Sequence, residues 1–593
     1  MARAILYGIA VSTGIAIGKG FFLNRASAGS VRREQISASA VESEAARLQK
    51  ALDSVAGDFI RARERLSQGQ GLRLQAEMLG MHLLICRDHK LGGEALRRIR
   101  EQRVSAEWAL EESVARIAED FSRINLPYIR DRIEDVRLVA HRVLQNLTGS
   151  ALRAASGDER GILLAYDLTP ADVAALSPEQ IFSFAIEQGG RTSHTGILAR
   201  SLHIPVVLGL SGLCDAVVGG ELLIVDGIAG KVLVEPDEAE LADYLVLQEQ
   251  HAAYERRIKA HALYPAETED GQRITVLANV ETAAEAESVV TAGGEGIGLV
   301  RTEFAYISRN TPPTEEALYE DYAAIVRAVA PGKVVFRTLD VGGEKLFSGR
   351  KSLDEANPAL GLRGIRYCLR HQDIFRTQLR AILRASAPGN VSLMFPFISD
   401  LTELRIAKSI LNEARQELDA DAAPFDAQMP VGIMVELPSV VLMADLLARE
   451  VDFFSIGTND LIQYSLGVDR SNKHVASMHQ PLHPAIVRAI KQVVDMAHRA
   501  GIPVSVCGEM AADPYCLPIL LGMAVDEISL APQSIPAIKH FIRHSGAAEC
   551  REILSQALTA PTVGLINTLV REVVYSRFPE DVSFFMSQMG VDG

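Results

Sequence analysis

Residues 431–460 read VGIMVELPSVVLMADLLAREVDFFSIGTND and contain two apolar runs with a helical pattern between them. The stretch begins and ends with a short apolar run, and each run stops at polar residues, Glu436 in the first case and Asn459 with Asp460 in the second. The residues between the runs carry Leu and Ala at helical spacing. A strand, a helix and a second strand in this order are typical of a unit that lays two parallel strands side by side.

Apolar runs of this kind recur along the second half of the chain and alternate with helical patterns. They are RITVLANV (273–280), GIGLVRTEF (296–304), KVVFRTLDVG (333–342), VSLMFPFIS (391–399), VGIMVELPS (431–439), VDFFSIGTND (451–460), IPVSVCGEM (502–510) and EISLAP (527–532). Eight strand-helix units over roughly 300 residues predict a (β/α)8 barrel, in which catalytic side chains lie where strands end and loops begin. The ends of the predicted strands carry Arg301, Arg337, Glu436, Asn459, Asp460 and Cys507.

The first half of the chain follows two other patterns. Residues 21–147 are nearly free of proline and carry apolar residues at helical spacing, which predicts a helical subdomain. Residues 1–20 and 148–235 hold short apolar runs between Gly and Pro turns, which predicts an α/β domain with the helical subdomain inserted into it. We expect the rest of this multidomain α/β chain to comprise a helical connector at 236–264, the barrel at 265–574 and a C-terminal extension at 575–593.

The composition excludes several classes of protein. The chain has 593 residues, of which 48% are hydrophobic, and its net charge of −15 argues against general nucleic-acid binding. Its six cysteines form no C-x-x-C pair, so neither a disulfide framework nor a Cys-ligated zinc site is indicated. No segment reaches the roughly 20 uninterrupted apolar residues of a membrane span, so we expect a cytoplasmic protein without membrane insertion.

The polar strand ends suggest a site for an anion and a metal ion. Glu436 and Asp460 end consecutive strands and can face one hard cation, which suits Mg²⁺ because this ion commonly takes one or two protein carboxylates. Guanidinium groups clamp phosphate or carboxylate through paired hydrogen bonds, so a small, multiply anionic ligand is expected. The arginines near strand ends or in loops are Arg301, Arg337, Arg363 and Arg470.

Cys507 ends the seventh apolar run and is followed by glycine. A lone cysteine is most often a buried, inert thiol. Its place at a strand end raises a second interpretation, in which the thiol donates a proton or acts as a nucleophile.

His194 lies in EQGGRTSHTGILAR (187–200), after two glycines and before a helical pattern. A lone histidine is more often structural than catalytic. Here, however, the glycines let the backbone approach a ligand, the start of a helix favours a phosphate, and imidazole is a nucleophile. We therefore predict that His194 accepts a phosphoryl group, with the help of metal and arginine groups from another domain.

Two long motifs carry a family resemblance. GGRTSHTGILARSLHIPVVLG (189–209) resembles the phosphohistidine motif of phosphoenolpyruvate-utilising enzymes, and DFFSIGTNDLIQYSLGVDR (452–470) resembles their barrel signature. From about residue 4 to 573 the domain order is similar to that of the enzyme I family of the phosphotransferase system. Related dikinases and synthases carry a large nucleotide-binding domain before the histidine, whereas here no G-x-x-x-x-G-K-[ST] loop precedes it.

The resemblance implies an activity and a partner. The phosphoryl group of phosphoenolpyruvate passes to His194 and then to a histidine on a small phosphocarrier protein, which docks on the helical subdomain, while pyruvate is released. It further implies a homodimer formed through the barrel. One departure is that residues 61–100, the family's acidic docking region, here hold nine Arg or Lys against four Asp or Glu.

The resemblance also implies a role for each residue of the barrel site. These roles are phosphate contacts for Arg301 and Arg337, substrate contacts for Arg363, Asn459, Asp460 and Arg470, Mg²⁺ ligation by Glu436 and Asp460, and proton donation by Cys507. Two alternatives stay open. One is a nitrogen-regulatory paralogue, which usually bears an N-terminal sensory domain not seen here, and the other is an interaction protein that senses phosphoenolpyruvate without turnover.

Overall fold

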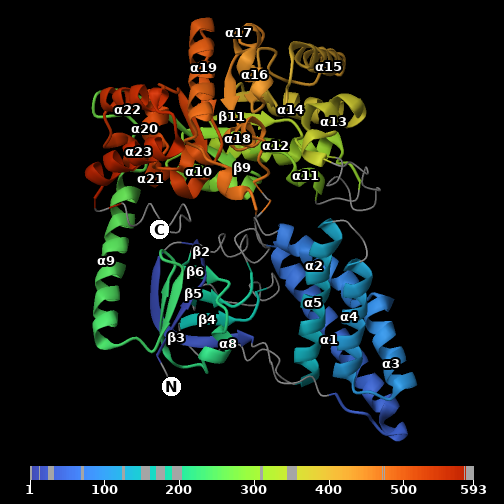
Figure 1. Ribbon diagram of the computed structural model, residues 1–593. Coiled ribbons are helices and arrows are strands. Elements are labelled where there is room, and N and C mark those ends of the chain that lie inside the picture. Colours follow the sequence, from blue (N-terminus) through green and yellow to red (C-terminus); the bar gives the residue numbers. More distant parts are fainter. Residues whose placement is uncertain are drawn as a thin grey trace. The chain divides into compact units, whose positions relative to one another are not determined.

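The structure is a computed structural model of the whole chain. It describes residues 3–12, 14–24, 33–68, 73–122, 127–148, 161–168, 181–189, 204–307, 311–342, 357–470, 472, 474–579 and 581. The chain forms two compact units that divide between Ala253 and Tyr254 (Figure 1). None of the helices in the described ranges is both long and apolar enough to cross a membrane.

The second unit is built on a closed barrel of parallel strands. The strands are β9 (Thr275–Val280), β10 (Gly296–Arg301), β11 (Lys333–Arg337), β12 (Val391–Phe395), β13 (Val431–Val435), β14 (Phe454–Ile456), β15 (Val504–Val506) and β16 (Glu527–Leu530). Each strand pairs with the next along the chain, and the last pairs with the first, with Glu527 opposite Thr275 and Leu530 opposite Ala278. All eight apolar runs therefore form strands, and the predicted (β/α)8 barrel is confirmed.

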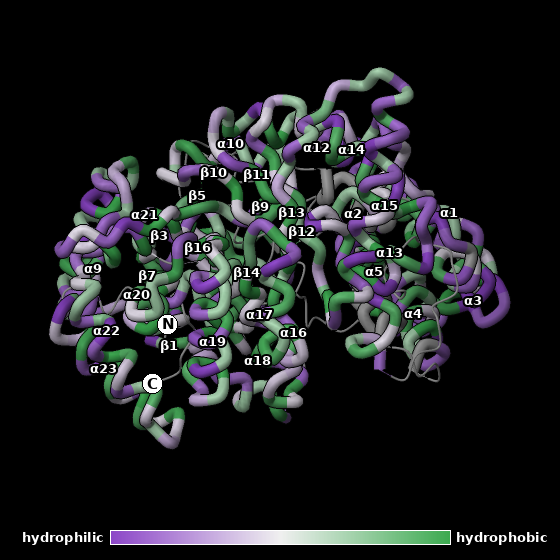
Figure 2. The backbone as a smooth tube through the Cα atoms, turned by 90° about the horizontal axis from the view of Figure 1, so that it is seen from above, coloured by the Kyte–Doolittle hydropathy of each residue, from purple (hydrophilic) through white to green (hydrophobic). Residues whose placement is uncertain are grey.

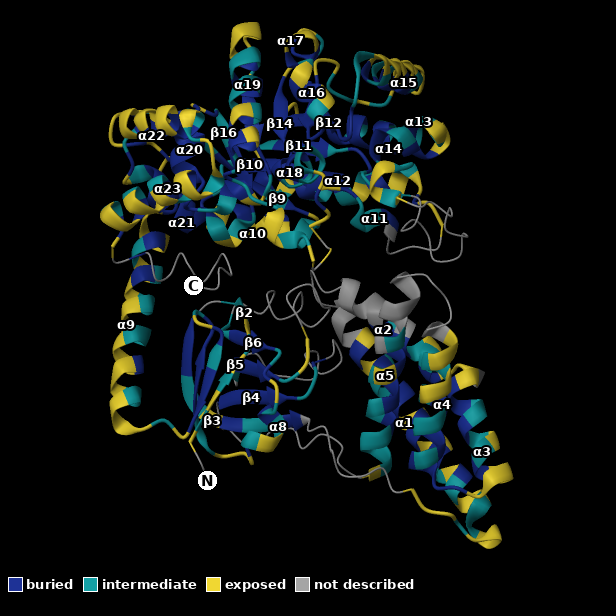
Figure 3. Ribbon diagram, in the orientation of Figure 1, coloured by how far each residue is buried: buried dark blue, intermediate teal, exposed yellow. Residues whose placement is uncertain are grey.

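Helices surround the barrel. They are α10 (Ala283–Thr291), α11 (Phe304–Ile307), α12 (Glu315–Val329), α13 (Gly364–Arg370), α14 (Gln372–Ala385), α15 (Leu401–Ala420), α16 (Pro438–Leu442), α17 (Ala444–Leu447), α18 (Thr458–Leu466), α19 (Pro484–Ala500), α20 (Leu517–Gly522), α21 (Ile535–Arg543), α22 (Ala547–Thr559) and α23 (Val563–Arg577). Helix α19 shows why they pack this way, because Ile486, Ile490, Val493 and Ala497 recur at helical spacing and are all buried. Hydrophilic and hydrophobic stretches alternate along such helices in Figure 2, and their exposed residues face outward in Figure 3.

The first unit contains a mixed sheet and a group of helices. The strands are β1 (Ala4–Tyr7), β2 (Ile9–Ser12), β3 (Ile15–Asn24), β4 (Gly161–Ala165), β5 (Ile181–Ile186), β6 (Val206–Leu208), β7 (Leu222–Asp226) and β8 (Lys231–Val234), in the order β1-β8-β7-β3-β4-β5-β6-β2. The helices are α1 (Val41–Gln68), α2 (Arg73–Cys86), α3 (Glu94–Gln102), α4 (Ala106–Ser122), α5 (Pro127–Thr148) and the short α8 (Leu213–Ala216). Helices α1 to α5 share a buried apolar cluster that includes Leu48, Phe59, Ile99 and Val139.

Helix α9 (Glu238–His261) runs without a break from the first unit into the second. Its last carbonyl groups have no partner within the helix. Just past this end, the ammonium group of Lys539 on α21 donates hydrogen bonds to the carbonyl oxygens of Ala262 and Tyr264, each at 3.0 Å. The lysine is buried, and burial lowers its pKa. These bonds fasten the end of α9 to the barrel.

We predict that Lys539→Met loosens this junction. Methionine keeps the length of the side chain but leaves two carbonyl groups without their donor, which costs about 1–3 kcal/mol of stability. Hydrogen exchange of the amides around 257–266 should become faster, and the calorimetric unfolding transition of the barrel should move to a lower temperature. Lys259→Met, at a side chain that is 68% exposed, is the matched control and should change neither quantity. Equal exchange in the two variants would contradict the prediction.

Candidate active site

A cavity of about 410 Å³ lies at the carboxyl ends of the barrel strands. All the barrel residues proposed from the sequence line it, namely Arg301, Arg337, Arg363, Glu436, Asn459, Asp460, Arg470 and Cys507. His194 lies outside the described residues. Sequence reasoning missed Asp340, Gln463 and Glu509, which also line the cavity. The sequence carries one indication that Asp340 belongs to the site, because it follows Arg337 by three residues in the same strand-end segment.

The barrel core explains why these side chains converge. Leu299, Val335 and Met434 belong to one buried cluster, together with Cys507. Because side chains alternate along a strand, the residue two positions further on points to the same side. Those residues are Arg301, Arg337 and Glu436. The apolar interior thus passes directly into the charged lining of the cavity.

Buried ion pairs connect the arginines of the floor. Nη2 of Arg337 lies 3.0 Å from Oε1 of Glu303, and its Nη1 lies 3.1 Å from Oδ2 of Asp340. Arg363 contacts Asp340 at 3.1 Å and Asp460 at 2.9 Å through Nη2. Burial opposes the charge of both arginines, but these carboxylates raise their pKa, so both guanidinium groups stay protonated.

Arg363 is held from two further sides. Its Nη1 donates to the hydroxyl of Tyr464 at 2.9 Å, and its guanidinium lies 4.5 Å from the centre of the Phe397 ring. A cation over an aromatic face is stabilised by the ring quadrupole. These contacts fix Arg363 although it precedes α13 and does not end a strand.

Glu436 is the most buried carboxylate of the cavity, with 2% of the residue exposed. Its Oε1 accepts the backbone N–H of Phe397 at 2.6 Å. Burial raises the pKa of Glu436, and the neighbouring carboxylates of Asp340 and Asp460 raise it further. One oxygen from each of these three groups lies within 4.8 Å of the others, so a cation among them would relieve their mutual repulsion.

The three carboxylates differ in whether they have an oxygen that accepts no hydrogen bond and can bind a metal ion. In the part of the chain that the structure describes, Oε2 of Glu436 and Oδ1 of Asp460 accept no hydrogen bond, whereas both oxygens of Asp340 accept Arg363. Free carboxylate oxygens are the donors that Mg²⁺ prefers. The Glu436 and Asp460 side chains therefore fit a hard divalent cation.

The rim of the cavity is more exposed than its floor. Arg301 pairs with Glu281 at 3.4 Å, and Arg470 lies 3.8 Å from Glu509. Asn459 exchanges two hydrogen bonds with Glu509, donating to its carboxylate at 3.2 Å and accepting its backbone N–H at 3.0 Å. These pairs are solvated and can be exchanged for contacts to a ligand at little cost.

Cys507 lies between the core and the cavity. Its thiol donates to the carbonyl oxygen of Ile456 at 3.6 Å, and burial raises its pKa. The group therefore remains a protonated thiol at neutral pH. The next residue, Gly508, packs against the start of α18, where a Cβ atom would lie 1.8 Å from Oγ1 and 2.8 Å from the backbone nitrogen of Thr458.

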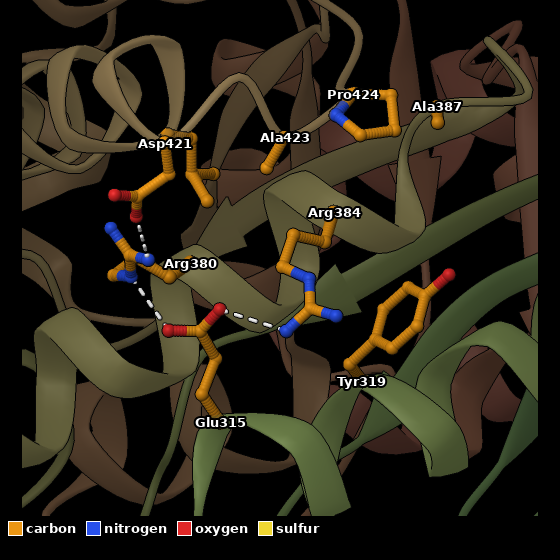
Figure 4. Close-up of a pocket in the computed structure, with 9 residues that line it drawn as sticks. Glu315, Tyr319, Arg380, Arg384, Ala387, Asp421, Ala423 and Pro424 are labelled. Carbon is orange, nitrogen blue, oxygen red and sulfur yellow. Dashed lines mark hydrogen bonds and ion pairs between the residues drawn. The ribbon is translucent and has the colours of Figure 1, made fainter.

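A second cavity of about 310 Å³ lies among α12, α14 and the end of α15 (Figure 4). Arg380 spans it with hydrogen bonds to Glu315, Glu417 and Asp421, and Arg384 binds Glu315. Each guanidinium group is thus already paired with carboxylates. The charged groups of this cavity therefore form an ion-pair network that joins α12, α14 and the end of α15.

Comparison with known proteins identifies the class. The family described as PEP-utilising enzyme, PEP-binding domain, matches residues 255–547, which contain the barrel and its cavity. The N-terminal domain of PEP-utilising enzymes matches residues 7–132, and their mobile domain matches residues 157–230, which include His194. PEP denotes phosphoenolpyruvate.

Curated relatives match along nearly the whole chain. The phosphoenolpyruvate-protein phosphotransferase of Listeria innocua is 37% identical over 96% of this chain and 99% of its own length. The enzyme of Geobacillus stearothermophilus is 39% identical over 95% of this chain and 97% of its own length. That of Staphylococcus aureus is 37% identical over 96% of this chain and 100% of its own length. The chain belongs to the phosphoenolpyruvate-protein phosphotransferase family of enzymes, and the resemblance drawn from the two motifs is confirmed.

We predict that Gly508→Ala lowers kcat/KM for phosphoenolpyruvate. The added methyl group must push away the start of α18, which carries Asn459 and Asp460, and a displacement of this kind costs about tenfold or more in kcat/KM. Steady-state kinetics with phosphoenolpyruvate measure the effect. The control is Gly546→Ala, where the new methyl group meets nothing closer than 3.9 Å. Normal kinetics of the Gly508 variant would show that the packing of α18 on β15 does not position the site.

Proposed function

We propose that this chain transfers the phosphoryl group of phosphoenolpyruvate to His194, releases pyruvate, and passes the phosphoryl group to a histidine on a small phosphocarrier protein. This is the first step of the sugar phosphotransferase system. The observation that carries the proposal is the cavity at the barrel mouth, in which buried arginines and two partly free carboxylates converge. The names of the relatives support it over a regulatory or purely sensing role.

The charges of the cavity suit phosphoenolpyruvate only with a bound cation. Among the described residues, four arginines and four carboxylates line the cavity, so its own charge is close to zero. Phosphoenolpyruvate carries roughly three negative charges at neutral pH. We propose that Glu436 and Asp460 hold Mg²⁺, which when bound neutralises charge on the substrate oxygens.

The chain's own side chains orient the substrate. Arg337 and Arg363 are fixed by buried ion pairs, so they present their remaining N–H groups at set positions on the cavity floor. Arg301 and Arg470 at the rim are exposed and can close over the phosphate or the carboxylate. Asn459 adds a donor beside them.

The reaction requires one proton for the leaving enolate. As the bond between phosphorus and the enol oxygen breaks, a bond to a nitrogen of His194 forms, and the leaving enolate gains a proton at carbon to become pyruvate. A buried thiol that stays protonated is suited to this step, and Cys507 lines the cavity. The resulting thiolate is then reprotonated from solvent.

The remaining parts of the chain support the second transfer and the assembly. We propose that helices α1 to α5 dock the phosphocarrier protein. Arg87 and Lys90, which are exposed after α2, would give the docking face a basic rim. We also propose a homodimer through the barrel. Leu442 on α16 is 75% exposed and Leu446 on α17 is 41% exposed, so this side of the barrel offers apolar surface to a second copy.

We predict that His194→Ala abolishes covalent phosphorylation while the barrel still binds phosphoenolpyruvate, because the nucleophile and the binding site belong to different units of the chain. Intact-mass spectrometry after incubation with phosphoenolpyruvate and Mg²⁺ detects the phosphorylation, and calorimetry detects the binding. His203→Ala, in the same motif, is the matched control and should be phosphorylated. Phosphorylation of the His194 variant would place the nucleophile elsewhere, and wild-type rates in excess EDTA would remove the metal from the mechanism.

We predict that Cys507→Ser slows the consumption of phosphoenolpyruvate about a hundredfold, since a hydroxyl is a far weaker acid than a thiol. Transfer between phosphorylated His194 and the carrier needs no proton at carbon and should keep its rate. The two half-reactions are measured separately, with a lactate dehydrogenase couple for pyruvate and with pre-phosphorylated carrier for the return transfer. Cys516→Ser, which changes another buried barrel thiol, should affect neither. A normal rate in the Cys507 variant would mean that water supplies the proton.

A further inference from the structure

Asp340 binds both buried arginines of the cavity with a single carboxylate. Its side chain is 5% exposed and lies three residues past the end of β11. Oδ2 lies 3.1 Å from Nη1 of Arg337, and both oxygens lie 3.1 Å from Nη2 of Arg363. The guanidinium group of Arg337, at the end of β11, and that of Arg363, just before α13, therefore bind the same carboxylate.

Backbone hydrogen bonds hold the loop that carries Asp340 in place. Its backbone N–H donates to Oε1 of Glu303 at 2.9 Å, and the same oxygen lies 3.0 Å from Nη2 of Arg337. The preceding residue, Leu339, donates its N–H to Oε1 of the buried Gln378 at 2.9 Å. The carboxylate thus stands on a loop that cannot shift without breaking hydrogen bonds in the barrel wall.

The backbone opposite Asp340 is shaped to admit the carboxylate. Gly364 has φ +56°, a conformation that favours glycine, and a Cβ atom there would lie 3.1 Å from Oδ1 of Asp340 and 2.6 Å from Cβ of Phe397. A larger residue at this position would press on both side chains. The space beside the first turn of α13 is therefore reserved for the Asp340 carboxylate.

Asp340 and the two proposed metal ligands share the cavity but differ in their partners. Both oxygens of Asp340 are taken by arginine, whereas Glu436 and Asp460 each keep one oxygen without a hydrogen bond in the described part of the chain. Two like-charged guanidinium groups repel each other in a site of low dielectric unless an anion lies between them. The Asp340 carboxylate is that anion.

Building on the function proposed above, we propose that Asp340 is a positioning residue that holds Arg337 and Arg363 side by side for the phosphoenolpyruvate anion, and that it is not a third ligand of the metal ion. Glu303 supports the same arrangement through Arg337 and through the backbone of Asp340. Neither residue needs to touch the substrate.

The test separates anion binding from metal binding in a background without turnover. Asp340→Asn is made in the His194→Ala protein, and calorimetry measures its affinity for phosphoenolpyruvate in the presence of Mn²⁺. Electron paramagnetic resonance measures the affinity of the substrate-free protein for Mn²⁺. We expect phosphoenolpyruvate to bind about ten- to a hundredfold more weakly, as for the loss of a charged hydrogen-bond partner, with Mn²⁺ affinity unchanged.

Two further variants serve as the positive and the negative control. Glu436→Gln should lower Mn²⁺ affinity, which shows that the resonance measurement detects the loss of a ligand. Asp421→Asn removes a carboxylate that pairs with Arg380 outside the site and should change neither affinity. Should Asp340→Asn fail to fold, Glu303→Gln tests the same arrangement, with a smaller loss of phosphoenolpyruvate affinity and no loss of Mn²⁺ affinity.

Unchanged phosphoenolpyruvate affinity in either the Asp340 or the Glu303 variant would overturn the proposal. So would a fall in the Mn²⁺ affinity of Asp340→Asn as large as that of Glu436→Gln, since Asp340 would then be a metal ligand. If the His194→Ala parent binds no phosphoenolpyruvate, the proposed function fails, and the role of Asp340 is decided by the Mn²⁺ measurement alone.

Discussion

The pairing of β16 with β9 is the constraint on which the rest of the active site depends. It closes eight parallel strands into a ring, so that all their carboxyl ends meet around one opening. Side-chain alternation then decides which residues point inward, and the buried column of Leu299, Val335 and Met434 ends in two arginines and a carboxylate. Residues 97 positions apart in the chain thereby come within contact distance, as Arg337 and Met434 show.

The sequence predicted the barrel well, because each strand is a short apolar run bounded by polar or turn residues and this pattern depends only on local burial. Seven of the eight cavity residues proposed from the sequence follow such runs or their signature loop directly. The eighth, Arg363, precedes α13, and it was proposed as an arginine near a strand end or loop and from the family resemblance. The structure adds the reason for its place, which is its contacts with Tyr464 and Phe397.

The sequence places Asp340 near Arg337, but it does not show that Asp340 pairs with both arginines. From the sequence, an aspartate in a strand-end loop is most simply a solvated charge, and nothing local shows that two arginines will surround it. Its role depends on Arg363, which lies 23 residues further along the chain, and on the barrel closing so that Asp460 joins them. Pairings of this kind are properties of the tertiary structure, so spacing alone cannot reveal them. His194 lies outside the described part of the chain, so its role stays a prediction from the sequence.

The ion pairs between the cavity arginines and carboxylates of the same chain affect which anions the cavity can bind. Arg337 and Arg363 are already neutralised by Glu303, Asp340 and Asp460, so the cavity floor presents little net positive charge to solvent. A lone sulfate or inorganic phosphate ion gains little by entering, since it must compete with carboxylates that are held in place. Under the proposed function, phosphoenolpyruvate would bind together with a divalent cation, which would supply the positive charge that the floor lacks. We therefore expect the internal acids to disfavour small anions that enter the cavity without a cation.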